Sequence, residues 1–161
     1  MIQKRAVTET DEVFLFQLYS STRLDELAAW GWDEVMQQQF LQLQWRAQKH
    51  SYAMQYPDAE HILLCYQNIP IGRIIVARSD TAVILVDITI LPDYRGMGIG
   101  TTLIRELQNE AAASLHPLLL SVLPTNRAMQ LYERLGFRAI GSLGLHISME
   151  WTPTPSGEGT F

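Results

Sequence analysis

Three glycines separated by single apolar residues form the most informative part of the chain, the segment Leu91-Pro92-Asp93-Tyr94-Arg95-Gly96-Met97-Gly98-Ile99-Gly100-Thr101. Glycine lets backbone N–H groups crowd against a ligand, and the start of a helix adds positive potential at the same place. Arg95 could add a charge-assisted hydrogen bond at the rim of the turn. These residue types predict an anion site, for a phosphate or pyrophosphate. A tight strand-to-helix turn without a ligand is the simpler alternative, and the pattern alone leaves it open.

Two well-known phosphate loops do not fit this segment. A P-loop ends in Gly-Lys-Ser/Thr, whereas Thr101 follows Gly100 directly. A dinucleotide-binding turn needs a carboxylate about 20 residues further on, and that distance falls in Leu118 to Leu123, which holds no acid. The sequence therefore excludes both kinds of loop.

Helical periodicity surrounds the turn on both sides. Apolar spacing predicts helices from Val13 to Tyr19, from about Asp25 to Ala47 with an interruption at Trp30-Gly31-Trp32, from Ile99 to Ala111, and from Arg127 to Leu135. Asp33 is expected to cap the restarted helix, and Gly136 to end the last one. In the restarted helix, the stripe Met36, Phe40, Leu43 and Ala47 is expected to be apolar, with the glutamines between them (Gln37, Gln38, Gln39, Gln42, Gln44) on the solvated face.

Strand signals fill the rest of the chain. Runs rich in Ile, Val and Leu predict strands at residues 2–7, 61–66, 71–77, 83–91 and 118–123, with one or two more in 137–151. Turns are expected at Asn68-Ile69-Pro70 and Ser79-Asp80, so that the second to fourth strands are antiparallel neighbours. The continuous apolar run from Leu118 to Leu123 is typical of a strand covered on both faces.

The composition indicates one packed domain. The chain has 161 residues, 47% of them hydrophobic and 18% charged, with a formal net charge of −5. That charge disfavours a nucleic-acid partner and suits a cationic small molecule or peptide. The single cysteine, Cys65, excludes a disulfide framework and a multi-cysteine zinc site. Without a long apolar stretch or a signal-peptide core, a cytoplasmic protein without a membrane partner is expected.

Two motifs together resemble the GCN5-related N-acetyltransferase (GNAT) family. Arg95-Gly96-Met97-Gly98-Ile99-Gly100 matches the Arg/Gln-x-x-Gly-x-Gly/Ala signature of that family. The second match is the pattern Asn-x-x-Ala-x-x-Leu-Tyr-x-x-x-Gly-Phe, which runs from Asn126 to Phe137. The resemblance implies a mixed α/β fold over residues 1–151, with a mostly antiparallel central sheet splayed in the middle and helices on both faces. Residues 152–161 are then expected to form a flexible tail.

The resemblance also implies acetyl-CoA as cosubstrate, without a metal. Backbone amides of the glycine turn would bind its pyrophosphate, and the preceding strand would pair with the pantetheine arm and offer an N–H to the thioester oxygen. Asn126 would hydrogen-bond the same arm. The implied cofactor-binding residues are Ile88, Thr89, Ile90, Arg95, Gly96, Met97, Gly98, Ile99, Gly100, Thr101 and Asn126.

For catalysis, the resemblance implies that Tyr132 is the general acid, although a packing tyrosine would have the same periodicity. The base is less well marked, because Ser121 stands where many relatives have glutamate. Asp87 lies between Val86 and Ile88 in an apolar strand, on the face of Leu85 and Thr89, and could serve as the base. The alternatives are an aspartate that only makes structural hydrogen bonds, Glu26, and a relay of waters.

Acceptor recognition is expected in residues 19–56. Aromatic and carboxylate side chains there would suit an ammonium group, although most of the aromatics could instead belong to the core. The candidates are Tyr19, Arg23, Asp25, Glu26, Trp30, Trp32 and Tyr56, of which we select Tyr19, Arg23, Glu26 and Trp30 as substrate-binding residues. The four histidines lack metal-ligand spacing, and Cys65 is expected to be a buried apolar residue.

The expected reaction is therefore acetyl transfer from acetyl-CoA to a primary amine of a small molecule, by direct attack. Two alternatives stay open: a non-catalytic domain that binds or senses acyl-CoA, and an enzyme that acetylates protein N-termini or lysines. The resemblance also allows a homodimer.

Overall fold

Within residues 1–153, which the computed structural model of this chain describes, seven strands form one sheet in the order β1-β2-β3-β4-β5-β7-β6. The strands are β1 (Ile2–Ala6), β2 (Glu60–Tyr66), β3 (Ile69–Arg78), β4 (Val83–Ile90), β5 (Leu118–Val122), β6 (Arg138–Leu143) and β7 (His146–Trp151). The helices are α1 (Glu12–Ser21), α2 (Leu24–Ala29), α3 (Glu34–Gln55), α4 (Ile99–Ser114) and α5 (Ala128–Arg134), with 3-10 turns η1 (Glu9–Asp11) and η2 (Pro92–Tyr94). The expected mixed α/β class with a mostly antiparallel sheet is confirmed.

The chain packs as two compact units. Unit 1 comprises Met1–Ile75 and Asp87–Arg95, and unit 2 comprises Val76–Val86 and the described residues from Gly96 onward. The expectation of one domain that ends at residue 151 stays a prediction. Of the expected tail, residues 154–161 lie outside the described residues. None of the helices in residues 1–153 combines the length and the apolar composition that a membrane span requires.

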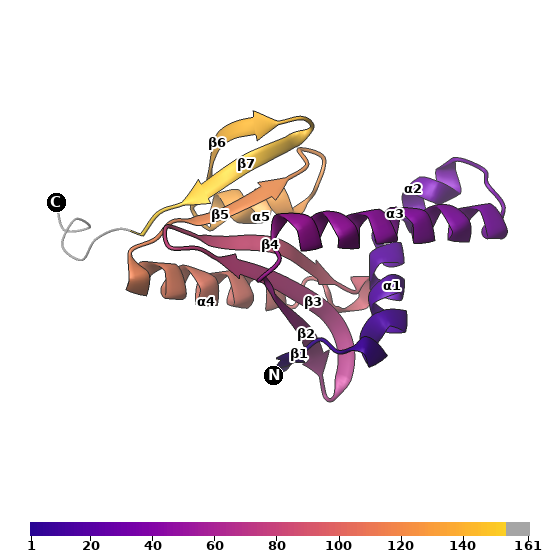
Figure 1. Ribbon diagram of the computed structural model, residues 1–161, viewed down its shortest axis with the longest axis horizontal. Helices are drawn as coiled ribbons and strands as arrows, with labels where there is room; N and C mark the ends of the chain where they lie inside the picture. The colour runs from indigo at the N-terminus through magenta and orange to yellow at the C-terminus, as the bar shows by residue number, and fades with distance from the viewer. Residues whose placement is uncertain (154–161) are drawn as a thin grey trace. The chain divides into compact units, whose positions relative to one another are not determined.

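Unit 1 contains the strands β1 and β2 and the first three α-helices (Figure 1). Strand β1 pairs with β2 in antiparallel register, with Ile2 opposite Tyr66. One core cluster consists of Leu15, Leu18, Leu63 and Cys65, so the prediction that Cys65 is a buried apolar residue is confirmed. The turn after β2 lies at Gln67 and Asn68, which both have positive φ, and β3 already includes Ile69 and Pro70. The expected turn was therefore placed slightly too late.

The interruption between α2 and α3 follows the sequence prediction. The carboxylate of Asp33 accepts a hydrogen bond from the Met36 N–H at 2.8 Å and so caps α3. Trp30, Trp32 and Phe40 pack edge to face, with ring centroids 5.1 to 5.6 Å apart. These contacts fix the turn between the two helices.

The expected orientation of α3 is wrong for part of its length. Gln37 and Gln44 are half-buried, whereas Leu43 of the expected apolar stripe is 66% exposed. The inward glutamines are tolerated because they are hydrogen-bonded: Gln37 donates to the Trp32 carbonyl, and Gln44 accepts from the Tyr19 hydroxyl. Periodicity identifies stripes on a helix, but the neighbouring side chains decide which stripe is buried.

Unit 2 contains α4, α5 and the strands β5, β6 and β7. Strand β5 pairs with β7 over all five of its residues, whereas its parallel pairing with β4 comprises only Val83 with Leu118 and Ile84 with Leu119. The expectation that β5 is covered on both faces is wrong, because Ser121 is exposed and burial alternates along the strand. Side chains of β5 therefore point alternately to a buried face and to a less covered face of the sheet.

A buried carboxylate anchors the start of α1. Arg5 donates to both carboxylate oxygens of Asp11 at 2.9 and 2.7 Å, and the Thr8 N–H donates at 2.8 Å. The Arg5 hydrogen bonds, followed by the Thr8 N–H, lower the pKa of Asp11 from 3.8 to about 2. Because the lowered pKa belongs to the folded state, the stabilisation is complete above pH ~4 and is lost as the pH falls towards ~2.

We expect Asp11→Asn to reduce the free energy of unfolding at pH 7 by about 1–2 kcal/mol, a value reduced for the partial exposure of Arg5. Urea denaturation at several pH values measures this. The difference between wild type and variant should shrink between pH ~4 and ~2, and a constant difference over that range would contradict the assignment.

Candidate functional site

The glycine turn forms an open backbone cradle at the start of α4, within unit 2. Gly96 and Gly98 both have φ of +79°, and a Cβ on either would meet no atom within 4 Å. The N–H of Thr102 bonds back to the Gly98 carbonyl, so the amides of residues 99–101 precede the regular helical hydrogen bonds. The first turn of α4 has no acidic residue. Amides that precede the helical hydrogen bonds, the positive potential of the helix start and the open space beside Gly96 and Gly98 together suit an anion.

The strand before the turn is less covered than a central strand normally is. All five residues from Val86 to Ile90 are half-buried, although β4 has a neighbour on each side in the sheet order. Arg95 is exposed, and its Nε donates to the Ile90 carbonyl at 3.0 Å. The structure thus fixes Arg95 to the end of β4.

Two residues of the second motif lie at α5: Asn126 just before the helix begins, and Tyr132 within it. The Asn126 side-chain oxygen accepts from the Ala128 N–H at 2.9 Å, which helps to start α5 and leaves the amide nitrogen as its donor. Tyr132 is buried, and its ring lies 5.7 Å from that of Phe137. A Cβ on Gly100 would lie 3.7 Å from Leu131, so α5 packs close to the glycine turn.

In unit 1, Asp87 belongs to a buried ion pair that sequence reasoning missed. The Nε of Arg73 on β3 donates to Asp87 Oδ2 at 2.6 Å, and the side chains are only 9% and 18% exposed. Another nitrogen of the same guanidinium donates to Gln48 on α3 at 2.9 Å. The Thr89 hydroxyl donates to the Asp87 carboxylate at 3.2 Å, which confirms that these two residues share a face. The available signal was an arginine, Arg73, in the middle of the apolar run of β3.

Tyr52 of α3 lies in the electrostatic field of this pair. Burial, followed by the negative charge of Asp87, raises the pKa of Tyr52 to about 12. Burial likewise raises the pKa of Tyr19, against the opposing charge of Arg73, and lowers the pKa of His61, where the charge of Arg73 acts in the same direction. The phenols of Tyr19 and Tyr52 are therefore neutral donors at pH 7.

The expected acceptor residues divide into two places. Tyr19 is buried, and the guanidinium of Arg23 stands 5.3 Å from its ring centroid. Glu26 is exposed. Trp30 is 45% exposed and belongs to the aromatic contact with Trp32 and Phe40. The structure thus brings Tyr19 and Arg23 together, and Trp30 contacts Phe40, which itself packs against the core cluster of Tyr19.

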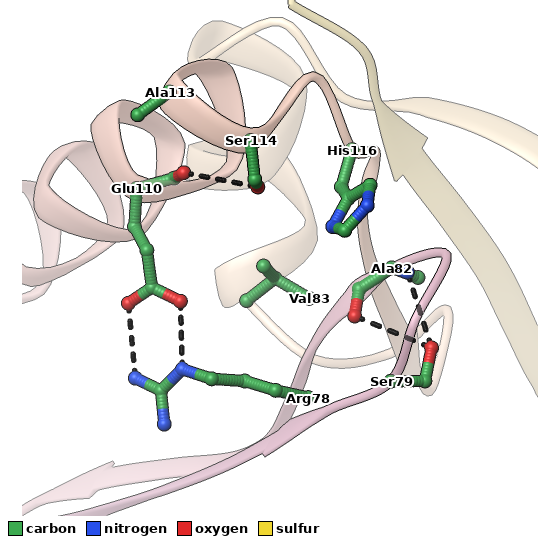
Figure 2. Close-up of a pocket in the computed structure, with 8 residues that line it drawn as sticks. All are labelled: Arg78, Ser79, Ala82, Val83, Glu110, Ala113, Ser114 and His116. Atoms are coloured by element: carbon green, nitrogen blue, oxygen red, sulfur yellow. Dashed lines mark hydrogen bonds and ion pairs between the residues drawn. The ribbon is translucent and has the colours of Figure 1, made fainter.

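A second feature is a surface pocket of about 350 Å³ at the far end of α4, again within unit 2 (Figure 2). It is lined by Arg78, Ser79, Ala82, Val83, Glu110, Ala113, Ser114 and His116. On one side of the pocket, the Arg78 guanidinium donates two hydrogen bonds to the Glu110 carboxylate, at 2.6 and 2.9 Å. None of the residues expected to do chemistry lies in this pocket. The residues from 1 to 153 also contain no group of His, Cys, Asp and Glu side chains arranged to hold a metal ion.

Comparisons with known proteins agree with this geometry. The family described as acetyltransferase (GNAT) domain matches residues 57–139, just over half of the chain. No curated protein sequence gave a match.

Solved structures that resemble this chain cover more of it than the family match does. The PaiA N-acetyltransferase of Thermoplasma acidophilum, solved with coenzyme A, is 18% identical with a TM-score of 0.70, covering 94% of this chain and 99% of its own. An acetyltransferase of Thermus thermophilus is 17% identical with a TM-score of 0.65, covering 93% and 95%. A GNAT acetyltransferase of Elizabethkingia anophelis with acetyl-CoA bound is 18% identical with a TM-score of 0.53, covering 63% and 82%. At these identities the likeness establishes the fold.

Proposed function

Because the chain belongs to the GNAT acetyltransferase family, we propose that it transfers the acetyl group of acetyl-CoA to a primary amine of a small molecule. The observation that carries the proposal is the cradle at the start of α4, where two glycines with positive φ leave amides and space for an anion. A pyrophosphate is the anion that acetyl-CoA would present there. The similar structures with bound coenzyme A or acetyl-CoA support this choice.

Each expected cofactor residue keeps a definite role in the proposal. Backbone amides from Gly96 to Thr101 bind the pyrophosphate, and Arg95 adds positive charge at the rim. Amides of Ile88 to Ile90 pair with the pantetheine arm, which the half-burial of this segment permits. The Asn126 amide nitrogen donates to the same arm, while the oxygen caps α5.

The reaction is a direct attack with two proton transfers. The amine nitrogen forms a bond to the acetyl carbon, and a β4 amide stabilises the oxyanion that develops. Asp87 takes the proton that the nitrogen loses, the carbon–sulfur bond breaks, and the phenol of Tyr132 protonates the departing thiolate. Asp87 suits this role because its Oδ1 accepts only from the Thr89 hydroxyl among the described residues.

The test is turnover with a panel of primary amines. Purified protein with acetyl-CoA should release thiol only when a suitable amine is present, and mass spectrometry should show a product heavier by one acetyl group. Thiol release without a modified small molecule, together with acetylated peptides, would favour a protein acceptor. Tight acetyl-CoA binding without turnover would indicate the sensing alternative, and calorimetry that detects no acetyl-CoA binding would contradict both.

A further inference from the structure

Arg73 is a buried cation in an apolar strand. Ile71, Ile74 and Ile75, its neighbours on β3, are almost fully buried, and the Arg73 residue itself is 7% exposed. Removing a guanidinium from water is costly unless its N–H groups find acceptors. Here it finds two, the carboxylate of Asp87 on β4 and the side-chain oxygen of Gln48 on α3.

We propose that Arg73 is the positioning residue for Asp87, and that Gln48 holds Arg73 in place, so that α3 sets where the Asp87 carboxylate meets the acceptor amine. This inference rests on the proposed function, because it takes Asp87 as the group that receives the proton of the amine.

The contacts fix the Asp87 carboxylate from two sides. Arg73 binds Oδ2, while the Thr89 hydroxyl lies 3.2 Å from Oδ1 and 3.3 Å from Oδ2. Gly72 lets β3 and β4 approach each other closely beside this pair, because a Cβ there would collide with the Thr89 carbonyl oxygen. The carboxylate is thus held in one rotamer, with a lone pair of Oδ1 left for a ligand.

Lysine cannot replace this arrangement. The planar guanidinium donates in two fixed directions at once, towards β4 and towards α3, whereas an ammonium is a flexible point charge. An Arg73→Lys variant therefore keeps the charge near Asp87 and loses the fixed geometry. Well-placed reacting groups contribute strongly to rate, so a small displacement of Asp87 reduces turnover.

The experiment compares Arg73→Lys and Gln48→Leu with the wild type and with Arg78→Lys. Arg78 lies at the other end of β3 and pairs with Glu110, so it controls for the change of an arginine on the same strand. We expect kcat to fall at least tenfold in Arg73→Lys and less in Gln48→Leu, with the KM for acetyl-CoA unchanged. The Arg78→Lys variant should keep the wild-type kcat.

Two further readouts separate positioning from a merely structural role. The pH profile of kcat and the ¹³C carboxyl shift of Asp87 should change in Arg73→Lys and Gln48→Leu and stay constant in Arg78→Lys. The other titratable groups that interact electrostatically with Arg73 or Asp87 are Tyr19, Tyr52 and His61, so the change of their signals with pH is measured as background and subtracted. A fall in kcat with an unchanged pH profile and Asp87 shift would overturn the proposal.

The proposed function and the positioning role of Arg73 can fail separately. One outcome is that the wild type forms no acetylated product with any amine tested, while the ¹³C shift of Asp87 changes in Arg73→Lys and not in Arg78→Lys. In that case the proposed function is wrong, and the positioning of Asp87 by Arg73 stands. If Arg73→Lys does not fold, Gln48→Leu decides the question, because it leaves the ion pair intact.

Discussion

Replacement of Tyr132 with phenylalanine should lower kcat for acetyl transfer by about 100-fold or more, the size of effect that a positioned general acid contributes. The ring of Tyr132 is buried in α5 and packs against Phe137, and phenylalanine keeps that packing. The substitution removes the phenolic hydroxyl group, so the departing thiolate must find its proton elsewhere. The affinity for acetyl-CoA should change by about twofold at most.

Steady-state kinetics over a range of pH, together with calorimetric binding of acetyl-CoA, measure both quantities. Tyr66→Phe is a matched control, because Tyr66 lies on β2 and its ring contacts Tyr94. That variant should retain the wild-type kcat. If Tyr132→Phe has unchanged turnover at every pH tested, Tyr132 is a packing residue and the general acid lies elsewhere.

Replacement of Gly98 with valine should weaken acetyl-CoA binding by about 30-fold or more, which corresponds to about 2 kcal/mol. A φ of +79° is strained for any residue with a Cβ and most strained for a β-branched one. The added side chain also enters the open space beside the amides of residues 99–101, where the pyrophosphate is proposed to bind. Both effects act on the cradle and leave the core untouched.

Gly141→Ala is the control, because Gly141 has no positive φ and a Cβ there would meet no atom within 4 Å. It should bind acetyl-CoA as the wild type does. Urea denaturation shows how much of the Gly98→Val effect is loss of stability. A variant that is destabilised yet binds acetyl-CoA with wild-type affinity would show that the turn does not hold the anion.

Local signals in the sequence were sufficient for most of the elements. Asp33 caps α3 through a contact three residues away, and Trp30-Gly31-Trp32 separates α2 from α3 as expected. The glycine turn was also predictable, since glycine is the residue type that accommodates the positive φ found at Gly96 and Gly98. These features depend on neighbours in the chain, so a single sequence contains them.

Orientation and long-range polar contacts were not predictable. The period of α3 defined several stripes, and only the packed structure showed that Gln44 is turned inward while Leu43 is exposed. Likewise, the sequence of β5 is mostly apolar and predicts a strand covered on both faces. In the structure its side chains alternate between a buried face and a less covered face, and Ser121 is exposed on the latter. Hydrophobicity alone does not determine which of two candidate faces is covered.

By itself, the sequence determined the order of the elements, the glycine cradle and the family resemblance, because each rests on adjacent residues or fixed spacings. Only the tertiary structure decided what Asp87 contacts. Its partner Arg73 lies 14 residues away, and Arg73 in turn reaches Gln48 across 25 residues. A buried guanidinium is stable only where such distant acceptors converge, and that convergence is a property of the fold rather than of any local pattern.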